Sequence, residues 1–192
     1  MRKILVTGFD PFGGATVNPS WQAVKALPAQ IGDFAVHTLQ IPTVFGKAAE
    51  AALEAAEQLQ PDVILCVGQA GGREAVTPER IGVNIRDARI ADNAGNQPKG
   101  AMVAEDGPAA YFATVPVETM AQAIRDGGIL ATVSNSAGAF VCNDVLYSLL
   151  HHFAGTQVKV GFIHVPYLPE QGSPSMELEK ITRALTAAIA VC

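Results

Sequence analysis

Short, almost entirely apolar segments alternate with segments of helical periodicity along this chain. Five segments have the apolar composition of buried strands: residues 3–9, 34–42, 62–68, 130–134 and 158–165. Five others place apolar residues at helical spacing: residues 20–27, 45–59, 117–125, 141–153 and 175–191. Strands buried on both faces occur in parallel sheets that helices cover on either side. The alternation therefore predicts an α/β fold.

Length and charge limit the classes of protein that this chain can belong to. Its 192 residues suffice for one sizeable core, and no linker-like segment divides them, so we expect a single domain over residues 1–192. The net charge is −5, without the basic stripe that nucleic-acid binding requires. No apolar run approaches the roughly 18 residues of a membrane span, and the first residues lead directly into a strand. The three cysteines, an odd number, fit a reducing compartment, so we expect a cytoplasmic protein without nucleic-acid or membrane partners.

Glycine-rich segments follow two of the expected strands. Ligand sites of open α/β sheets lie at the carboxyl ends of the strands, and residues 8–14 and 68–73 stand at such ends. Neither segment matches a dinucleotide-binding or P-loop motif. A tight turn and a ligand cradle both remain possible for each. The second segment opens a long irregular stretch, residues 68–110, that holds one strand-like piece at 80–85, and loops of this length are usually functional or disordered.

Cys142 is a candidate nucleophile because it stands where a small-residue loop, residues 134–140, gives way to a helical pattern. The helix dipole and the free N–H groups of a helix start favour a thiolate and can also stabilise an oxyanion. The alternative is a small buried hydrophobe, which suits Cys66 inside its strand. Cys192, at the end of the chain, has no such context.

A thiol nucleophile needs a base, and the chain has four histidines. His151 and His152 lie on the same expected helix as Cys142 but about 13 to 15 Å along it, too far for contact. His37 lies in the middle of a strand, whereas His164 ends the last strand at the edge where Cys142 is expected. His164 is therefore the better base, although a hydrogen-bonded structural histidine is the alternative. Spacing cannot select an orienting carboxylate among 18 acids, but Glu79 lies in the right region.

Four blocks of the sequence resemble the pyroglutamyl peptidase I family, in the order in which the family has them. The opening block is Phe9-Asp10-Pro11-Phe12-Gly13-Gly14 with Asn18-Pro19-Ser20-Trp21. Residues 68–73 and 77–84 resemble the glutamate signature of the family, residues 134–143 its cysteine signature, and residues 164–171 its histidine segment. The likeness extends from the first strand to the last helix.

The resemblance implies a cysteine peptidase that removes an N-terminal pyroglutamyl residue through a thioester acyl-enzyme. Cys142 would be the nucleophile, His164 the general base and acid, and Glu79 the residue that orients the histidine. Arg89 matches the family arginine near the cysteine and the oxyanion. Seven residues match positions near the pyroglutamyl ring: Phe9, Phe12, Asn18, Gln69, Ile90, Phe140 and Val141. The resemblance also implies a three-layer α/β/α fold, a cytoplasmic homotetramer, and no metal or other cofactor.

The chemistry of pyroglutamate suits these residue types. The ring is a flat, neutral lactam without a free amine, so a selective pocket needs apolar walls with one donor and one acceptor. Phe9, Phe12 and Phe140 can form such walls, and backbone groups near Gln69 and Val141 can pair with the ring carbonyl and N–H. The alternative for the phenylalanines is capping of the core under a loop.

Two rival functions remain possible. The first is a binding or phosphorylase-type α/β domain that uses its glycine-rich loops for a nucleoside or sugar phosphate. The second, a catalytically silent relative kept for assembly, is weakened because Cys142, His164, Glu79 and Arg89 are all present. The sequence departs from the family at Gly82, where alanine is usual, and in a chain end at Val191-Cys192 that is shorter than in many relatives.

Overall fold

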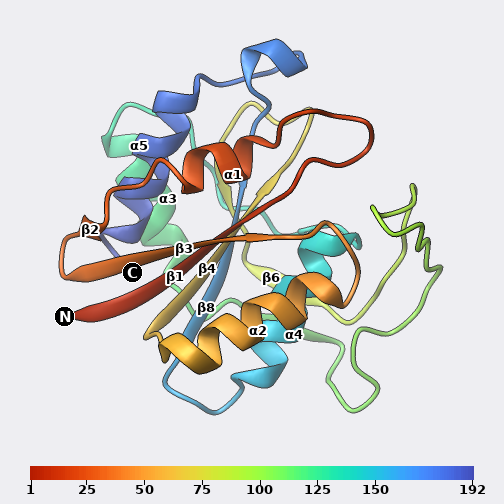
Figure 1. Cartoon of the computed structure of the whole chain (residues 1–192). Coiled ribbons are helices and arrows are strands. Elements are labelled where there is room, and N and C mark those ends of the chain that lie inside the picture. The colour runs from red at the N-terminus through yellow and green to blue at the C-terminus, as the bar shows by residue number, and fades with distance from the viewer.

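Four parallel strands, β3, β1, β4 and β8, form the centre of the protein in a computed structural model that describes residues 1–192 (Figure 1). Antiparallel strands, β2 and β5, close the two edges of the sheet. In hydrogen-bonded order the six strands are β2 (Gln30–Ile31), β3 (Phe34–Ile41), β1 (Arg2–Phe9), β4 (Val63–Gln69), β8 (Lys159–Val165) and β5 (Thr77–Pro78). Because β3 and β4 lie on opposite sides of β1, the loops that follow the strands diverge there, which is where α/β sheets bind ligands.

Helices cover both faces of the sheet (Figure 1). One face carries α2 (Lys47–Leu59) and α4 (Val141–His152). The other carries α1 (Pro19–Val24), α3 (Val117–Asp126) and α5 (Leu178–Ile189). The period-two alternation of strand side chains separates the apolar core into two buried clusters, one under each helix layer. This arrangement confirms the three-layer α/β/α class. None of the helices has the length and apolar composition needed to cross a membrane.

The prediction of a strand at residues 130–134 is wrong. This segment forms only isolated β-bridges, from Ala131 to Val76 and from Ser134 to Glu79. Backbone bonds do alternate between residues 130–134 and 76–80, as in a parallel ladder. The ladder is interrupted at Pro78, which has no N–H to donate. The interruption therefore comes from the partner segment and not from residues 130–134 themselves.

The other expected strands and helices are present with ends shifted by a few residues. The strand-like piece at 80–85 is β6 (Ile81–Val83), which pairs with β7 (Ala110–Phe112) in a separate two-stranded sheet. A short 3-10 helix, Pro169–Gln171, follows β8.

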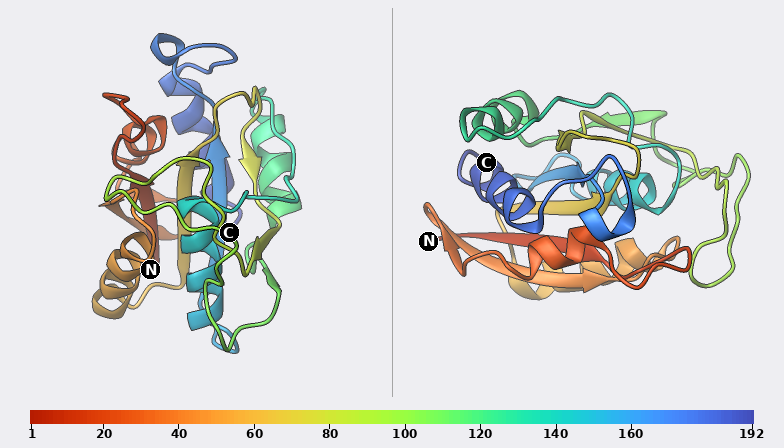
Figure 2. Two further views of the ribbon diagram at one scale, coloured as in Figure 1. Left: turned by 90° about the vertical axis from the view of Figure 1, so that its right-hand side faces the viewer. Right: turned by 90° about the horizontal axis from the view of Figure 1, so that it is seen from above.

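Side-chain hydrogen bonds order the long loop between β6 and β7, which extends beyond the sheet (green in the right view of Figure 2). The Asn84 side chain accepts hydrogen bonds from the N–H groups of Val103 and Ala104, and it donates to the carbonyls of Ala104 and Gly107. Asp92 accepts from the N–H groups of Ala94 and Asn96. The polar composition that indicated an irregular stretch therefore also supplies its internal bonds.

Candidate active site

His164, near the carboxyl end of β8, contacts the carboxylate of Glu79. Glu79 directly follows β5, and its backbone N–H donates to the carbonyl of Phe162 on β8. The Nδ1 atom of His164 lies 2.7 Å from Glu79 Oε1, and the two side chains are 5% and 0% exposed. Because an ionised carboxylate only accepts hydrogen bonds, Nδ1 carries the proton and Nε2 is the unprotonated nitrogen. The histidine is therefore oriented as a base.

Cys142 lies in the first turn of α4, after the N-cap residue Phe140. A Cβ atom on residue 68 would come within 2.8 Å of Cys142 Sγ, so the thiol lies directly against β4 at Gly68. Gly68 is the register partner of His164 in the parallel pair of β4 and β8, and neighbouring strands are about 4.8 Å apart. The sheet register thus brings the thiol and the imidazole to adjacent points on one face.

Two buried polar residues hold the start of α4 in this position. Asn143 accepts a hydrogen bond from the N–H of Val83 and donates to the Val83 carbonyl, which ties the helix to β6. Asp144 accepts from Arg86 Nε at 2.6 Å and from the N–H of Gly46 at the start of α2. Neither residue was expected from the sequence to have a role, although two polar side chains in an otherwise apolar helix were an available signal.

Burial dominates the protonation of the thiol and the imidazole. It raises the pKa of Cys142 to about 12, with the charge of Glu79 acting in the same direction and the charge of Arg73 opposing it. Burial also lowers the pKa of His164, although the contact with Glu79 opposes that change. The expected effect of the helix start on the thiol is outweighed. At neutral pH the pair is a neutral thiol beside a neutral imidazole, so this sulfur could act as a nucleophile only if it lost its proton in the same step.

Arg73 is a member of this cluster to which the sequence analysis assigned no role. Its NH1 atom lies 2.6 Å from Oε1 of Glu79, the same oxygen that His164 contacts. Burial alone would raise the pKa of Glu79, but His164 first, and then the Ser134 hydroxyl and Arg73, lower it below its usual value. The carboxylate is therefore ionised. A cation six residues before the glutamate was the available sequence signal.

A cavity of about 580 Å³ opens at the same carboxyl edge of the sheet, between the loops that follow β1, β4 and β8 and the long loop after β6, and Cys142, His164, Glu79 and Arg73 are not among its lining residues. It is lined by four of the expected substrate or catalytic residues: Phe12, Gln69, Arg89 and Ile90. Gln171, which the sequence analysis did not single out, also lines it and donates from Nε2 to Gln69 Oε1 at 2.9 Å. Arg89 is exposed there, and its side chain makes no ion pair or hydrogen bond within the chain.

The remaining expected pocket residues lie at or below the cavity wall. The Phe140 ring is 6.0 Å from the ring of Phe12, which lines the cavity. Phe9 is only 2% exposed and packs in the core against Phe162, with ring centroids 6.3 Å apart. Val141, the first residue of α4, is completely buried.

The side chain of Asn18 has structural contacts with two residues, Ser20 and Asp10. Its Oδ1 accepts from the N–H of Ser20, as the N-cap of α1, and its Nδ2 donates to the carbonyl of Asp10. These bonds fix the loop between β1 and α1, whose residues 12–17 line the cavity.

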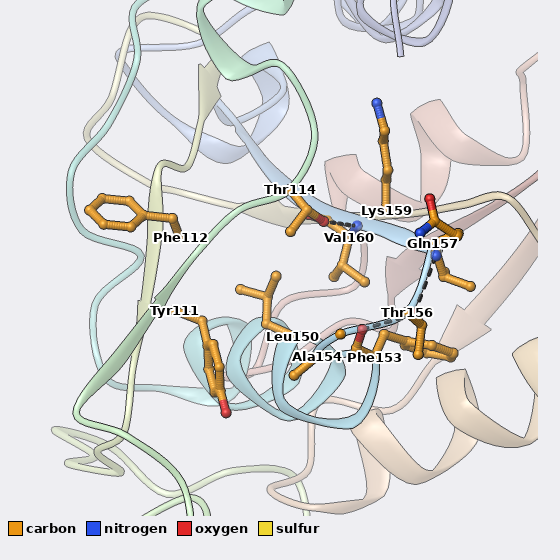
Figure 3. Close-up of a pocket in the computed structure, with 12 residues that line it drawn as sticks. Tyr111, Phe112, Thr114, Leu150, Phe153, Ala154, Thr156, Gln157, Lys159 and Val160 are labelled. Carbon is orange, nitrogen blue, oxygen red and sulfur yellow. Dashed lines mark hydrogen bonds between the residues drawn. The ribbon is translucent and has the colours of Figure 1, made fainter.

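A second cavity, of about 400 Å³, lies near the other end of β8 (Figure 3). Tyr111, Leu150 and Phe153 line it together with Lys159 and Val160, the first residues of β8. None of its lining residues is a cysteine, histidine or carboxylate. The cysteine, histidine and carboxylate side chains that could carry chemistry therefore lie at the carboxyl end of the sheet. No group of three or more His, Cys, Asp or Glu side chains in the chain is arranged to hold a metal ion.

Comparisons with known proteins agree with the geometry. The model of a family described as pyroglutamyl peptidase matches residues 2–192. The pyrrolidone-carboxylate peptidase of Alkaliphilus oremlandii is 50% identical over 97% of this chain and 91% of that protein. The protein of that name from Enterobacter sp. is 51% identical over 100% of this chain and 92% of its own length.

Solved structures give the same result. Pyroglutamyl peptidase I of Bacillus amyloliquefaciens matches with a TM-score of 0.96 and 47% identity, over 100% of this chain and 96% of that chain. Pyrrolidone carboxyl peptidase of Thermococcus litoralis matches with a TM-score of 0.95 and 41% identity, over 100% and 93%. The chain therefore belongs to the pyroglutamyl peptidase family of cysteine peptidases.

Proposed function

We propose that this enzyme hydrolyses the bond after an N-terminal pyroglutamyl residue of peptides and proteins, with Cys142, His164 and Glu79 as its catalytic triad. One observation carries the assignment of residues. The thiol of Cys142 lies on Gly68, the register partner of a histidine whose Nδ1 is held by a buried glutamate. Membership of the family supports the substrate class.

The first half of the reaction forms a thioester. Cys142 Sγ attacks the carbonyl carbon between the pyroglutamyl residue and the next residue, while His164 Nε2 takes the thiol proton. Glu79 stabilises the imidazolium that results. The tetrahedral oxyanion is stabilised by N–H groups at the start of α4 and by Arg89, which reaches it from the cavity rim. His164 then gives its proton to the leaving amine as the C–N bond breaks.

The second half releases pyroglutamate. A water molecule takes the place of the departed amine, and His164 Nε2 removes a proton from it as the oxygen attacks the thioester carbon. The C–S bond breaks, the proton returns from the imidazole to the sulfur, and the free carboxylic acid leaves. Neither half changes an oxidation state, and each ends with His164 neutral.

We propose that the pyroglutamyl ring is held between apolar walls and a few polar groups. Phe12, Phe140 and Ile90 form the walls near the cavity, with Phe9 as a buried support beneath them. Gln171 donates a hydrogen bond to the side-chain oxygen of Gln69. The amide nitrogen of Gln69 is therefore available to donate to the ring carbonyl. The backbone near Val141 and the loop that Asn18 fixes complete the pocket.

The proposal is tested with fluorogenic amides of pyroglutamate, proline and glutamine. We expect hydrolysis of the pyroglutamyl amide, and kcat/KM lower by at least about 10²-fold for the other two, because one lacks the ring carbonyl and the other brings a charged amine. Cys142→Ala should abolish turnover with the melting temperature nearly unchanged. Substantial turnover by Cys142→Ala, or equal rates on the three amides, would contradict the proposal. A melting shift with nucleoside or sugar phosphates, without hydrolysis, would favour a binding domain instead.

We further propose that residues 1–192 form one catalytic domain and that the enzyme works in the cytoplasm as a homotetramer. Both apolar clusters pack on the same sheet, which supports the single domain. The assembly and the location rest on the resemblance to the family. Sedimentation equilibrium tests the assembly, and a monomer at micromolar concentration would contradict it.

A further inference from the structure

One cation in the catalytic cluster has no part in the mechanism above. Arg73 lies in the loop after β4, and the geometry points to a positioning role for it, an inference that rests on the proposed function. We propose that Arg73, by sharing one carboxylate oxygen of Glu79 with His164 and by binding the loop before Cys142, limits how strongly Glu79 acts on the imidazole. Arg73 thereby keeps His164 available as a base.

The contacts of Arg73 connect three segments of the site. Its NH1 atom lies 2.6 Å from Glu79 Oε1 and 2.7 Å from Thr77 Oγ1 on β5. Its NH2 atom donates to the carbonyl of Ser136, in the loop that leads to α4, at 3.1 Å. The side chain is 33% exposed, whereas Glu79 is fully buried. A planar guanidinium can make these bonds together, and a lysine ammonium lacks that fork.

Sharing one oxygen makes the two donors competitors. When His164 takes a proton, its Nδ1–H and the guanidinium both bind Oε1 of Glu79, and their positive charges repel each other. Without Arg73, the whole carboxylate would stabilise the imidazolium. The histidine would then hold its proton more strongly, and it would be a neutral base over a narrower pH range.

The surrounding charges agree with this direction. His164 is faced by Glu79 from the segment after β5, by Arg73 from the loop after β4 and by Cys142 from α4. Cys66 on β4 adds a neutral thiol next to Cys142. Arg73 lowers the pKa of His164 and also opposes the rise in the pKa of Cys142. The effect on Cys142 favours loss of the thiol proton, and the effect on His164 keeps the imidazole neutral, and thus able to accept that proton, over a wider pH range.

Arg80 provides a matched control because it is bonded to the same loop but not to the carboxylate. Its Nε donates to Asn135 Oδ1 at 2.8 Å, and its guanidinium pairs with Glu118 on α3. It is 38% exposed, close to the exposure of Arg73. Arg80→Gln thus removes an equivalent charge and a loop contact without touching Glu79.

The test compares pH profiles of kcat/KM for a fluorogenic pyroglutamyl amide. For Arg73→Gln we expect the acidic limb to move to higher pH by about one unit, with kcat lower and KM nearly unchanged. Arg73→Lys keeps the charge and should retain the acidic limb of the parent enzyme. Arg80→Gln should match the parent enzyme in both respects. The pH dependence of Cys142 alkylation by iodoacetamide, which needs no substrate, should move to higher pH in Arg73→Gln as well.

Two results would overturn the proposal. In the first, Arg73→Gln loses the same fraction of activity at every pH, and Arg73→Lys does not restore that activity. This result would indicate a purely structural residue. The other is a profile of Arg73→Gln that coincides with that of the parent enzyme. If Arg73→Gln does not fold, Arg73→Met supplies a second neutral variant. If neither neutral variant folds but Arg73→Lys does, the proposal is also overturned, because the charge of Arg73 is then needed for folding. Absence of hydrolysis by the parent enzyme would instead refute the proposed function, and the alkylation profile would still decide the role of Arg73.

Discussion

Two histidines in this protein each lie beside a carboxylate, one near the carboxyl end of β8 in the sheet and one in the last turn of α4. His164 Nδ1 is 2.7 Å from Glu79 Oε1, and both side chains are almost completely buried. His151, in the last turn of α4, has its Nε2 3.3 Å from Asp106 Oδ1, and the aspartate is 86% exposed. An exposed pair of this kind is screened by water and contributes little, whereas a buried carboxylate fixes both the orientation and the charge of its histidine.

The two histidines also differ in the surroundings of the ring nitrogen that does not face the carboxylate. Nδ1 of His151 lies 2.9 Å from the hydroxyl of Tyr111, and the Tyr147 ring stacks on the imidazole, so both nitrogens and one face have neighbours. His164 has one nitrogen held by Glu79 and the other available, and the thiol of Cys142, on α4, lies against the neighbouring strand β4 at Gly68. A histidine–carboxylate contact therefore indicates catalysis only where the second nitrogen is left for proton transfer.

The largest effect is expected from removing each imidazole in turn. His164→Gln should lower kcat/KM for a pyroglutamyl amide by at least about 10⁴-fold, because the general base and acid is lost. His151→Gln should leave it within about twofold, since it changes only contacts with Asp106 and Tyr111. Steady-state kinetics on both variants measure the difference. Similar losses in both would remove the distinction between the two sites.

The two carboxylates give the next largest difference. Glu79→Gln keeps the size of the side chain but removes the charge that stabilises the imidazolium, so kcat should fall by about 10³-fold with KM nearly unchanged. Asp106→Asn should have no measurable effect on either constant, because Asp106 is exposed and pairs with His151, at the opposite end of α4 from Cys142. A loss in Glu79→Gln that appears mainly in KM would contradict the orienting role.

Arg89 extends the comparison from the histidine to the substrate end of the same site. Arg89→Ala should lower kcat by about 10²-fold, and Arg89→Lys should lower it less, because the charge near the oxyanion is kept. An uncleavable pyroglutamyl analogue, measured by calorimetry, should bind both variants with nearly unchanged affinity. If Arg89→Ala instead abolishes analogue binding while kcat at saturation is preserved, Arg89 belongs to substrate binding alone.

The smallest effect concerns Cys66, a completely buried thiol on the same face of the sheet as the partly exposed Cys142. Burial raises the pKa of Cys66 to about 12, as it does for Cys142, so titration alone does not distinguish the two thiols. Cys66→Ala should leave catalysis unchanged and lower the free energy of unfolding by about 1 kcal/mol through lost packing. For a chain of this size the melting temperature should fall by about 2 to 4 °C. Thermal unfolding measures the loss of stability, and a parallel assay measures the activity. Lost activity in a folded Cys66→Ala protein would contradict the assignment of Cys142 as the only catalytic thiol.

The sequence predicted the layers because their signal is local. A run such as residues 63–67 is apolar on both faces, which indicates a buried parallel strand wherever its partners lie. The interruption at residues 130–134 was missed because its cause, Pro78, lies in another segment that the sequence does not place beside it. The short strands β2, β5 and β7 were missed because two or three residues carry no periodicity.

By itself, the sequence determined the α/β class and selected Cys142 and His164, because a helix start and a strand end can be located from periodicity. It could not choose Glu79 among 18 acids without a resemblance to a family. Only the tertiary structure decided that the thiol lies on Gly68 beside His164, and that Arg73 shares an oxygen of Glu79 with the histidine. These contacts join residues that are far apart in the chain. They depend on strand register and on burial, and no local sequence pattern encodes the register or the burial.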